Sequence, residues 1–147
     1  MNTDFEPKVL PFKTDQKNLF EEVRKIRELV FVQEQEVDEA EEFDSFEDES
    51  QHFVLRLGDK AIGTARWRHI GDKIKLERFA VLKEYRGKKY GDVLLQAVIE
   101  DVLPFAKAVY LHAQLKAIPF YKRRGFKQVG ELFLECDIEH YKMVLES

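Results

Sequence analysis

The apolar positions in the first third of the chain predict a short strand followed by a long amphipathic helix. Residues 8–13 favour the strand, which their proline weakens. From about residue 16 to residue 33 the apolar positions recur at the spacing of one helical face, and Thr14 or Asp15 can cap this helix. The apolar residues of that face are Leu19, Phe20, Val23, Ile26, Val30 and Phe31.

The next segment, residues 34–49, carries ten acidic residues and no lysine or arginine. Such a dense charge of one sign predicts an exposed loop. Strand patterns follow it at residues 51–57, 61–70 and 73–81, where β-branched and aromatic residues are frequent. Glycine–aspartate pairs separate these strands, which predicts an antiparallel meander with two tight turns. The third strand alternates imperfectly, so we expect both of its faces to be partly buried.

The second half of the chain changes its periodicity again. Residues 91–102 predict a helix, 106–113 a strand and 117–124 a short helix that Gly125 ends. Residues 126–145 predict two antiparallel strands with a break at the Cys136–Asp137 pair. A strand, a turn, a helix and another strand in succession predict a parallel crossover. The fold class is therefore α/β (α+β): a mixed, mostly antiparallel sheet flanked by helices, in one domain spanning residues 1–147.

Composition and charge narrow the class of protein. The 147 residues fit one domain with a self-sufficient core, and the net charge of −4 leaves no basic footprint for nucleic acid. The lone cysteine, Cys136, excludes an internal disulfide, and metal-ligand spacings are absent. The first six residues lack a basic region followed by an apolar run, so we expect no signal peptide. Without a membrane-length apolar stretch, we expect a soluble cytoplasmic protein.

Residues 84–92 form the most informative segment, a basic turn with two glycines between an apolar strand and an amphipathic helix. Unpaired amides at a helix start, together with the helix dipole, favour anions such as a pyrophosphate. An ordinary surface turn with solvated lysines is the alternative. A Walker A loop is excluded because no Gly-Lys-Ser/Thr follows. A dinucleotide-binding fingerprint is also disfavoured, because three antiparallel strands precede the turn.

Three segments resemble one known family. Arg86-Gly87-Lys88-Lys89-Tyr90-Gly91 resembles the Arg/Gln-x-x-Gly-x-Gly/Ala motif of the GNAT superfamily of N-acetyltransferases. The run from Pro119 to Phe126 resembles its second motif, aromatic-Tyr-x-x-x-Gly-Phe. Residues 27–35 resemble the first helix of the ElaA/YjcF-like branch. The same branch is matched at Ala113-Gln114, Gly130-Glu131, Ile138 and His140.

This resemblance covers nearly the whole chain and implies a fold, a cofactor and a set of residues. The fold would be a GNAT-type sheet of six to seven strands, and the cofactor would be acetyl-CoA. The residues placed at the cofactor would be Phe79, Ala80, Val81, Arg86, Gly87, Lys88, Lys89, Tyr90, Gly91, Asp92, Gln114, Phe120 and Tyr121. The residues placed on the substrate side would be Phe31, Glu34, Gln35 and His140.

Lys89 stands where the family usually has glycine. If that position needs a positive φ, a lysine there costs about 1 kcal/mol or more. Because the anion contacts would come from backbone amides, we expect cofactor binding to survive.

The resemblance also implies a reaction: an acetyl group moves from acetyl-CoA to a primary amine by direct attack, with no covalent enzyme intermediate. Tyr121 would protonate the departing thiolate. Glu77 is the first candidate for the base, and Glu34, His52, His112, Gln114 or solvent stay open as alternatives. No basic residue adjoins Cys136 in the sequence, which favours a structural thiol over a nucleophile.

The acceptor and the alternatives follow from the remaining features. Negative potential at residues 34–49 would attract a small cationic amine, unless the segment only aids solubility. Homodimers are common in the family, so a homodimer is a state to test. A different functional class is a catalytically degraded acyl-CoA sensor or interaction module on the same fold. An acyl-homoserine lactone synthase shares the architecture, but the short chain and the Tyr121 motif argue against it.

Overall fold

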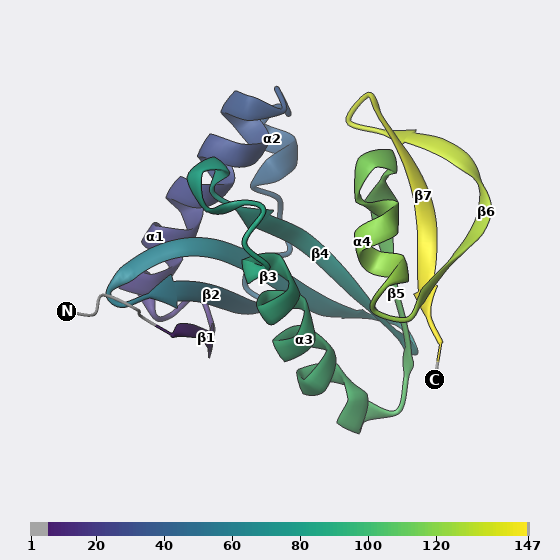
Figure 1. Ribbon diagram of the computed structural model, residues 1–147, viewed down its shortest axis with the longest axis horizontal. Coiled ribbons are helices and arrows are strands. Elements are labelled where there is room, and N and C mark those ends of the chain that lie inside the picture. The colour runs from purple at the N-terminus through teal and green to yellow at the C-terminus, as the bar shows by residue number, and fades with distance from the viewer. Residues whose placement is uncertain (1–5, 147) are drawn as a thin grey trace.

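A computed structural model describes residues 6–146, and its strands form one seven-stranded sheet in the order β1-β2-β3-β4-β5-β7-β6 (Figure 1). The strands are β1 (Pro7–Phe12), β2 (Gln51–Leu57), β3 (Lys60–Ile70), β4 (Lys73–Val81), β5 (Ala108–Gln114), β6 (Phe126–Glu135) and β7 (Ile138–Leu145). The helices are α1 (Lys17–Arg27), its π-helical continuation η1 (Glu28–Glu34), α2 (Glu39–Glu42), α3 (Tyr90–Val102) and α4 (Ile118–Lys122).

The topology confirms the predicted mixed sheet. Strands β1 to β4 form an antiparallel meander, and α3 connects β4 to the parallel strand β5. Strand β7 then pairs antiparallel with β5 on one side and with β6 on the other. The break between β6 and β7 is a tight turn at Cys136 and Asp137, both of which have positive φ. None of the helices within residues 6–146 has the length and apolar composition that crossing a bilayer requires.

Helices cover both faces of the sheet because successive side chains of a strand point to opposite faces. On one face, Leu94 and Val98 of α3 join the main core with Leu55 of β2 and Leu76 of β4. On the other face, α1 packs onto β2, β3 and β4, where Val23 lies against Val54 in a smaller apolar cluster. Strand β4 therefore buries residues on both faces, Ile74 and Leu76 toward α3 and Ala80 toward α1, as its imperfect alternation predicted.

The pairing of β4 with β5 is short, and this is the feature that positions the functional site. It covers only Lys73–Leu76 against Ala108–Leu111, after which the two strands spread apart (Figure 1). Close to this point β4 also carries a bulge against β3, where Arg78 adopts a φ of 62°. Bulges bend a strand and increase its twist locally. The β5-facing edge of β4 beyond Leu76 is thus left without a strand partner.

Several element ends differ from the sequence-based expectation. Helix α1 begins after Gln16, with no side-chain cap, because the Thr14 hydroxyl donates to Asp48 at 2.6 Å instead of capping the helix. The predicted strand at 106–113 begins two residues later, since Ala106 has a φ of 54° and ends a 3-10 turn. Residues 1–5, which contain most of the segment used to exclude a signal peptide, lie outside the described residues.

The acidic stretch at residues 34–49 confirms the predicted exposure for most of its residues, but Glu42, Asp44 and Glu47 depart from it because they pack onto the sheet. Asp38 caps α2 by accepting a hydrogen bond from the amide of Ala40. At the end of α2, Glu42 is buried (3%) and accepts a hydrogen bond of 2.8 Å from Nε of Arg27. The expected exposure was wrong for these three carboxylates because the arginines that neutralise them lie far away in the sequence.

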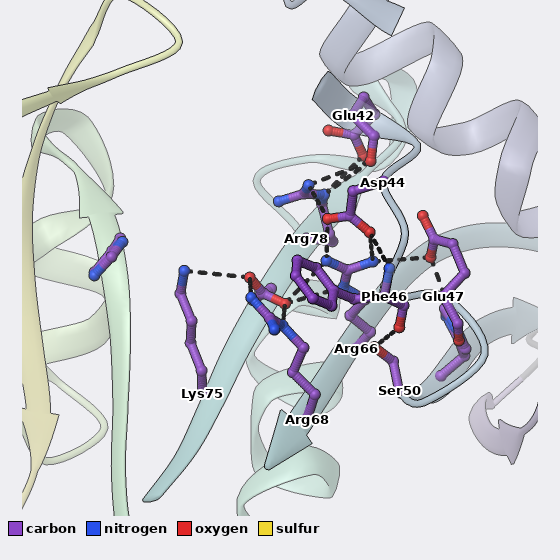
Figure 2. Close-up of polar contacts among 12 residues, drawn as sticks. Glu42, Asp44, Phe46, Glu47, Ser50, Arg66, Arg68, Lys75 and Arg78 are labelled. Atoms are coloured by element: carbon purple, nitrogen blue, oxygen red, sulfur yellow. Dashed lines mark hydrogen bonds and ion pairs between the residues drawn. The ribbon is translucent and has the colours of Figure 1, made fainter. Parts of the chain in front are cut away.

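Arg66 on β3 is the centre of the ion pairs that hold this segment to the sheet (Figure 2). Its side chain is 1% exposed and lies 2.7 Å from Asp44, 2.9 Å from Glu47 and 3.0 Å from Glu77. Arg78, the bulge residue of β4, adds a contact of 3.1 Å to Asp44. A buried charge that loses its partner is costly, so these residues stabilise the fold only as a complete set.

The arginines also set the protonation of the carboxylates in this cluster. Burial alone would raise the pKa of Glu77, but the charge of Arg66 and a hydrogen bond from Arg68 outweigh it and lower the pKa to about 2. For Asp44 the hydrogen bond and charge of Arg66 likewise outweigh burial and lower the pKa to about 2. Glu42 differs, because burial outweighs its cationic partners and raises its pKa.

These shifts predict an acid-sensitive fold. A carboxylate whose pKa is lower in the folded chain gives stability above its unfolded pKa, and that stability is lost as the pH falls toward its folded pKa. We therefore expect the free energy of unfolding to fall between pH 4.5 and pH 2. Urea unfolding followed by the fluorescence of the single tryptophan, Trp67, measures it.

The substitution Glu77→Gln tests the assignment within the cluster. It should cost about 3 kcal/mol at pH 7, because it leaves buried cations underneutralised. It should also reduce the fall in stability between pH 4.5 and pH 2. The matched control is Glu131→Gln, at an exposed position of β6, where stability should stay unchanged. A parallel loss of stability with pH in wild type and Glu77→Gln would contradict the role of Glu77.

Candidate active site

A cavity of about 610 Å³ occupies the opening between β4 and β5. Its walls come from β4 and β5, from η1 and the acidic segment, from α4, and from the β6–β7 turn. Five acidic and five basic residues line it, so the lining carries no large excess of either sign. These residues are Glu41, Glu42, Asp44, Glu77, Glu135, Arg68, Lys75, Arg78, Arg86 and Lys116.

The basic turn lies between β4 and α3, beside this cavity, and its backbone fits an anion. Gly87 has a φ of 78°, and Lys89, the N-cap of α3, has a φ of 68° and a ψ of 15°. No amide from Gly87 to Asp92 donates to a backbone carbonyl within residues 6–146. Successive free amides in such a turn form a concave anion site. A Cβ built on Gly91 would lie 3.5 Å from Phe120 and 4.0 Å from Val81, which places the turn against the cavity wall.

The side chain of Arg86 is not aimed at that turn. Its Nε donates to the carbonyl of Val81 at 2.8 Å, and its Nη2 donates to Glu34 at 2.8 Å. The hydrogen bond from Arg86 is the largest cause of a lowered pKa at Glu34. Arg86 therefore joins η1 to β4 at the cavity mouth, and its charge is shared with Glu34. Within residues 6–146, the backbone amides of the turn are therefore free to meet an anion, whereas this guanidinium is already paired.

Gln35 follows Glu34 and makes the second bridge across the cavity. Its side-chain oxygen accepts a hydrogen bond of 2.8 Å from Gln114, the last residue of β5. The end of η1 is thus tied to both strands that border the opening. The sequence pattern placed Gln35 on the substrate side and Gln114 at the cofactor, and the structure brings the two into contact.

Tyr121 enters the cavity from α4, on the α3 side of the sheet. Its side chain is 8% exposed and packs edge-on against Phe79, Phe120 and Phe126. The hydroxyl has no hydrogen-bond partner within residues 6–146, yet it is not sealed from the cavity. Burial raises the pKa of Tyr121 well above its ordinary value. The phenol therefore stays protonated and is available as a donor.

Glu77 lines the cavity, but its contacts make it a weak base. Its carboxylate lies 3.0 Å from Arg66, 2.9 Å from Arg68 and 3.2 Å from Lys75. A carboxylate whose pKa is lowered to about 2 accepts protons poorly at neutral pH. His52 is buried at the far side of the acidic segment, where its Nε2 lies 2.9 Å from the carbonyl of Glu47.

The structure brings half of the sequence-predicted site residues to one cavity. Those that line it are Phe31, Gln35, Glu77, Phe79, Val81, Arg86, Gln114, Tyr121 and His140. Glu34 lies at the border of the cavity, where it accepts a hydrogen bond from the lining residue Arg86. The turn from Gly87 to Asp92 also borders the cavity, because Gly91 lies close to the lining residue Val81. Ala80 instead packs toward α1. Sequence reasoning missed Glu135, whose only signal was its place just before the last turn.

The comparison with known proteins adds an independent observation. A family model described as "Acetyltransferase (GNAT) domain" matches residues 15–147. The chain belongs to the GNAT acetyltransferase family. The protein named "Uncharacterized N-acetyltransferase YjcF" from Bacillus subtilis is 40% identical over 121 residues, which cover 81% of this chain and 86% of that protein.

Solved structures agree with the GNAT assignment. The crystal structure of Escherichia coli ElaA is 26% identical, with a TM-score of 0.85, and covers 95% of this chain and 99% of that one. PaiA N-acetyltransferase from Thermoplasma acidophilum, solved in complex with coenzyme A, shares the fold at 15% identity and a TM-score of 0.67, covering 97% and 99%. The fold, the family and its N-acetyltransferase class are thereby established.

The positive φ of Lys89 generates a prediction about this GNAT turn. A non-glycine residue in the left-handed region costs about 1–2 kcal/mol, whereas glycine loses about 0.5–1 kcal/mol more chain entropy on folding. Lys89→Gly should therefore raise the free energy of unfolding by about 0.5–1 kcal/mol. Urea unfolding measures this gain, and calorimetry should find acetyl-CoA binding retained.

Lys88→Gly is the matched control, because it removes the same charge one residue earlier, where φ is not positive. There the added chain entropy has no compensation, so the variant should lose about 0.5–1 kcal/mol. Equal effects of the two substitutions would contradict the assignment of backbone strain to Lys89.

Proposed function

We propose that this chain transfers the acetyl group of acetyl-CoA to a primary amine, which attacks the thioester directly without a covalent enzyme intermediate. One observation carries the proposal: three features of the right chemistry converge on one cavity. They are the free edge of β4, the unpartnered hydroxyl of Tyr121 and the free amides before α3. Membership of the GNAT family makes an acyl-CoA the expected partner of such a cavity.

Each feature would act on a different part of acetyl-CoA, which supplies the thioester whose acetyl group is transferred. The free amides from Gly87 to Asp92 would hold the pyrophosphate, because a helix start stabilises anions. The free edge of β4 at Phe79, Ala80 and Val81 would pair with the pantetheine arm as an added strand does. Gln114 and Phe120, at the edges of the opening, would flank it.

Tyr121 is the proposed acid. It shares the cavity with the β4 edge, and burial keeps its hydroxyl protonated. The leaving thiolate needs one proton, which a phenol within reach can donate. The amine nitrogen bonds to the acyl carbon while the carbon–sulfur bond breaks, the amine gives up one proton to a base or to solvent, and the hydroxyl proton of Tyr121 passes to the sulfur.

The acceptor is proposed as a primary amine of a small molecule or peptide, with Phe31, Glu34, Gln35 and His140 on its side of the cavity. The acidic segment gives little support for a preference for cations. Its carboxylates Glu42 and Asp44 are already paired with arginines, and the cavity lining is balanced in charge. A thiol-release assay over polyamines, amino acids, aminoglycosides and peptide N-termini would identify the class.

A second candidate is an acyl-CoA-binding sensor on the same fold. Glu77 is the first candidate for the base, and its cationic neighbours make it a poor proton acceptor. An enzyme that relied on this carboxylate would be slow, which favours the sensor. Tight acetyl-CoA binding in calorimetry, with no thiol release for any amine in the panel, would select the sensor. An absence of acetyl-CoA binding would contradict both proposals.

The substitution Tyr121→Phe tests the enzymatic proposal. Because a general acid contributes about 10²–10⁴-fold, kcat should fall by at least about 100-fold. Acetyl-CoA affinity should stay within about twofold, since the ring still packs against Phe79. The control is Tyr141→Phe on β7, outside the cavity, which should leave kcat unchanged. An unchanged kcat in Tyr121→Phe would remove Tyr121 from the mechanism.

A further inference from the structure

Three side chains from three different strands meet at the wall of the cavity that Tyr121 also lines. His112 lies on β5, Glu135 is the last residue of β6, and His140 is on β7. Strand pairing brings them together, because His140 is the register partner of Gln114 and Ile138 that of Glu135. All three side chains line the 610 Å³ cavity.

The carboxylate of Glu135 fixes the orientation of the His112 ring. Nδ1 of His112 lies 3.1 Å from Oε2 of Glu135. The hydrogen bond from His112 is the largest cause of a lowered pKa at Glu135, so this group is an ionised acceptor at neutral pH. An ionised carboxylate only accepts, which assigns the proton to Nδ1 of His112. The ring of Phe133 packs edge-on against His112 at 4.8 Å and limits its rotation.

The other ring nitrogen of His112, Nε2, then carries a free lone pair at the cavity wall. Within residues 6–146, Nε2 of His112 has no hydrogen-bond partner, and it is not sealed from solvent. The side chain as a whole is 23% exposed. A neutral imidazole with one nitrogen held by a carboxylate and the other free has the arrangement of a general base.

The neighbouring histidine is less suited to this task. Nδ1 of His140 lies 2.6 Å from the carbonyl of Ile138, and its Nε2 lies 3.7 Å from Oε1 of Glu135. His140 is 6% exposed and stacks on Phe133, so its free nitrogen faces the carboxylate rather than open cavity.

We propose that His112 is the general base that removes the proton from the acceptor amine, and that Glu135 is the positioning residue that orients it. The inference rests on the proposed function. As the amine nitrogen bonds to the acyl carbon, one amine proton passes to Nε2 of His112. Tyr121 gives its proton to the departing sulfur, and proton exchange through solvent restores both residues. Acid and base thus act in one cavity, which both side chains line.

Charged groups on every neighbouring strand face His112. Glu135 lies on β6, and His140 and Lys142, the register partner of His112, lie on β7. Lys75 and Glu77 lie on β4, where they pair with each other at 3.2 Å. Glu135 is the charged group that His112 contacts, and Lys75 and Glu77 already pair with each other.

The test compares His112→Gln, Glu135→Gln and a histidine control in the acetyl-CoA thiol-release assay, with the best amine from the panel. His112→Gln should lower kcat about 100-fold and abolish the acidic limb of the kcat/KM profile, while acetyl-CoA affinity in calorimetry stays unchanged. Glu135→Gln should lower kcat about tenfold and move that limb to lower pH. The control His69→Gln, at an exposed position of β3 outside the cavity, should behave as wild type.

Chemical rescue separates catalysis from structure. Added imidazole should restore part of the activity of His112→Ala and should not affect His69→Ala. An unchanged kcat and pH profile in His112→Gln, with active wild type, would overturn the base assignment alone. A loss of activity that imidazole does not rescue, with an unfolding midpoint lowered to match, would show a structural role and also overturn it. If wild type acetylates no amine, the proposed function fails and this inference fails with it.

Discussion

The early end of the pairing between β4 and β5 is the constraint on which the rest of the site depends. Backbone groups on a strand edge need partners, and water or a ligand must supply them where no strand does. Beyond Leu76, β4 has such an edge, and everything that the proposed chemistry uses surrounds it. The bulge at Arg78 bends β4 close to the point where it leaves β5. The bulge of β4 therefore lies directly beside the opening between the two strands.

The ion pairs around Arg66 keep that wall in place. Without them, residues 37–50 would carry too much charge of one sign to pack, and the cavity would lose the side formed by Glu42 and Asp44. The same pairing has a chemical consequence. The ion pairs lower the pKa of Glu77 to about 2, so this carboxylate is a poor proton acceptor. Because Arg66 and Arg68 pair with Glu77, this carboxylate stabilises the fold and is poorly suited to act as a base.

The sequence predicted what depends on local patterns, and it failed where distant residues decide. The meander, the crossover and the last hairpin follow from periodicity and turn residues, and the structure contains all of them. The motif also indicated that Lys89 stands at a position that can need a positive φ, and the structure has a positive φ there. The burial of Glu42 was not foreseen, because its partner Arg27 lies fifteen residues away on a helix. The contact between His112 and Glu135 was equally hidden, since it needs the register of three strands.

The two walls of the cavity differ in a way that matches the two halves of acyl transfer. Tyr121 is nine-tenths buried among aromatic rings, and this burial raises the pKa of its hydroxyl, which therefore stays protonated at neutral pH. His112 is more exposed and held by a carboxylate, which suits a group that must exchange protons with solvent in each cycle. In the proposed mechanism, the gap between β4 and β5 would bring proton removal by His112 and proton delivery by Tyr121 into one cavity.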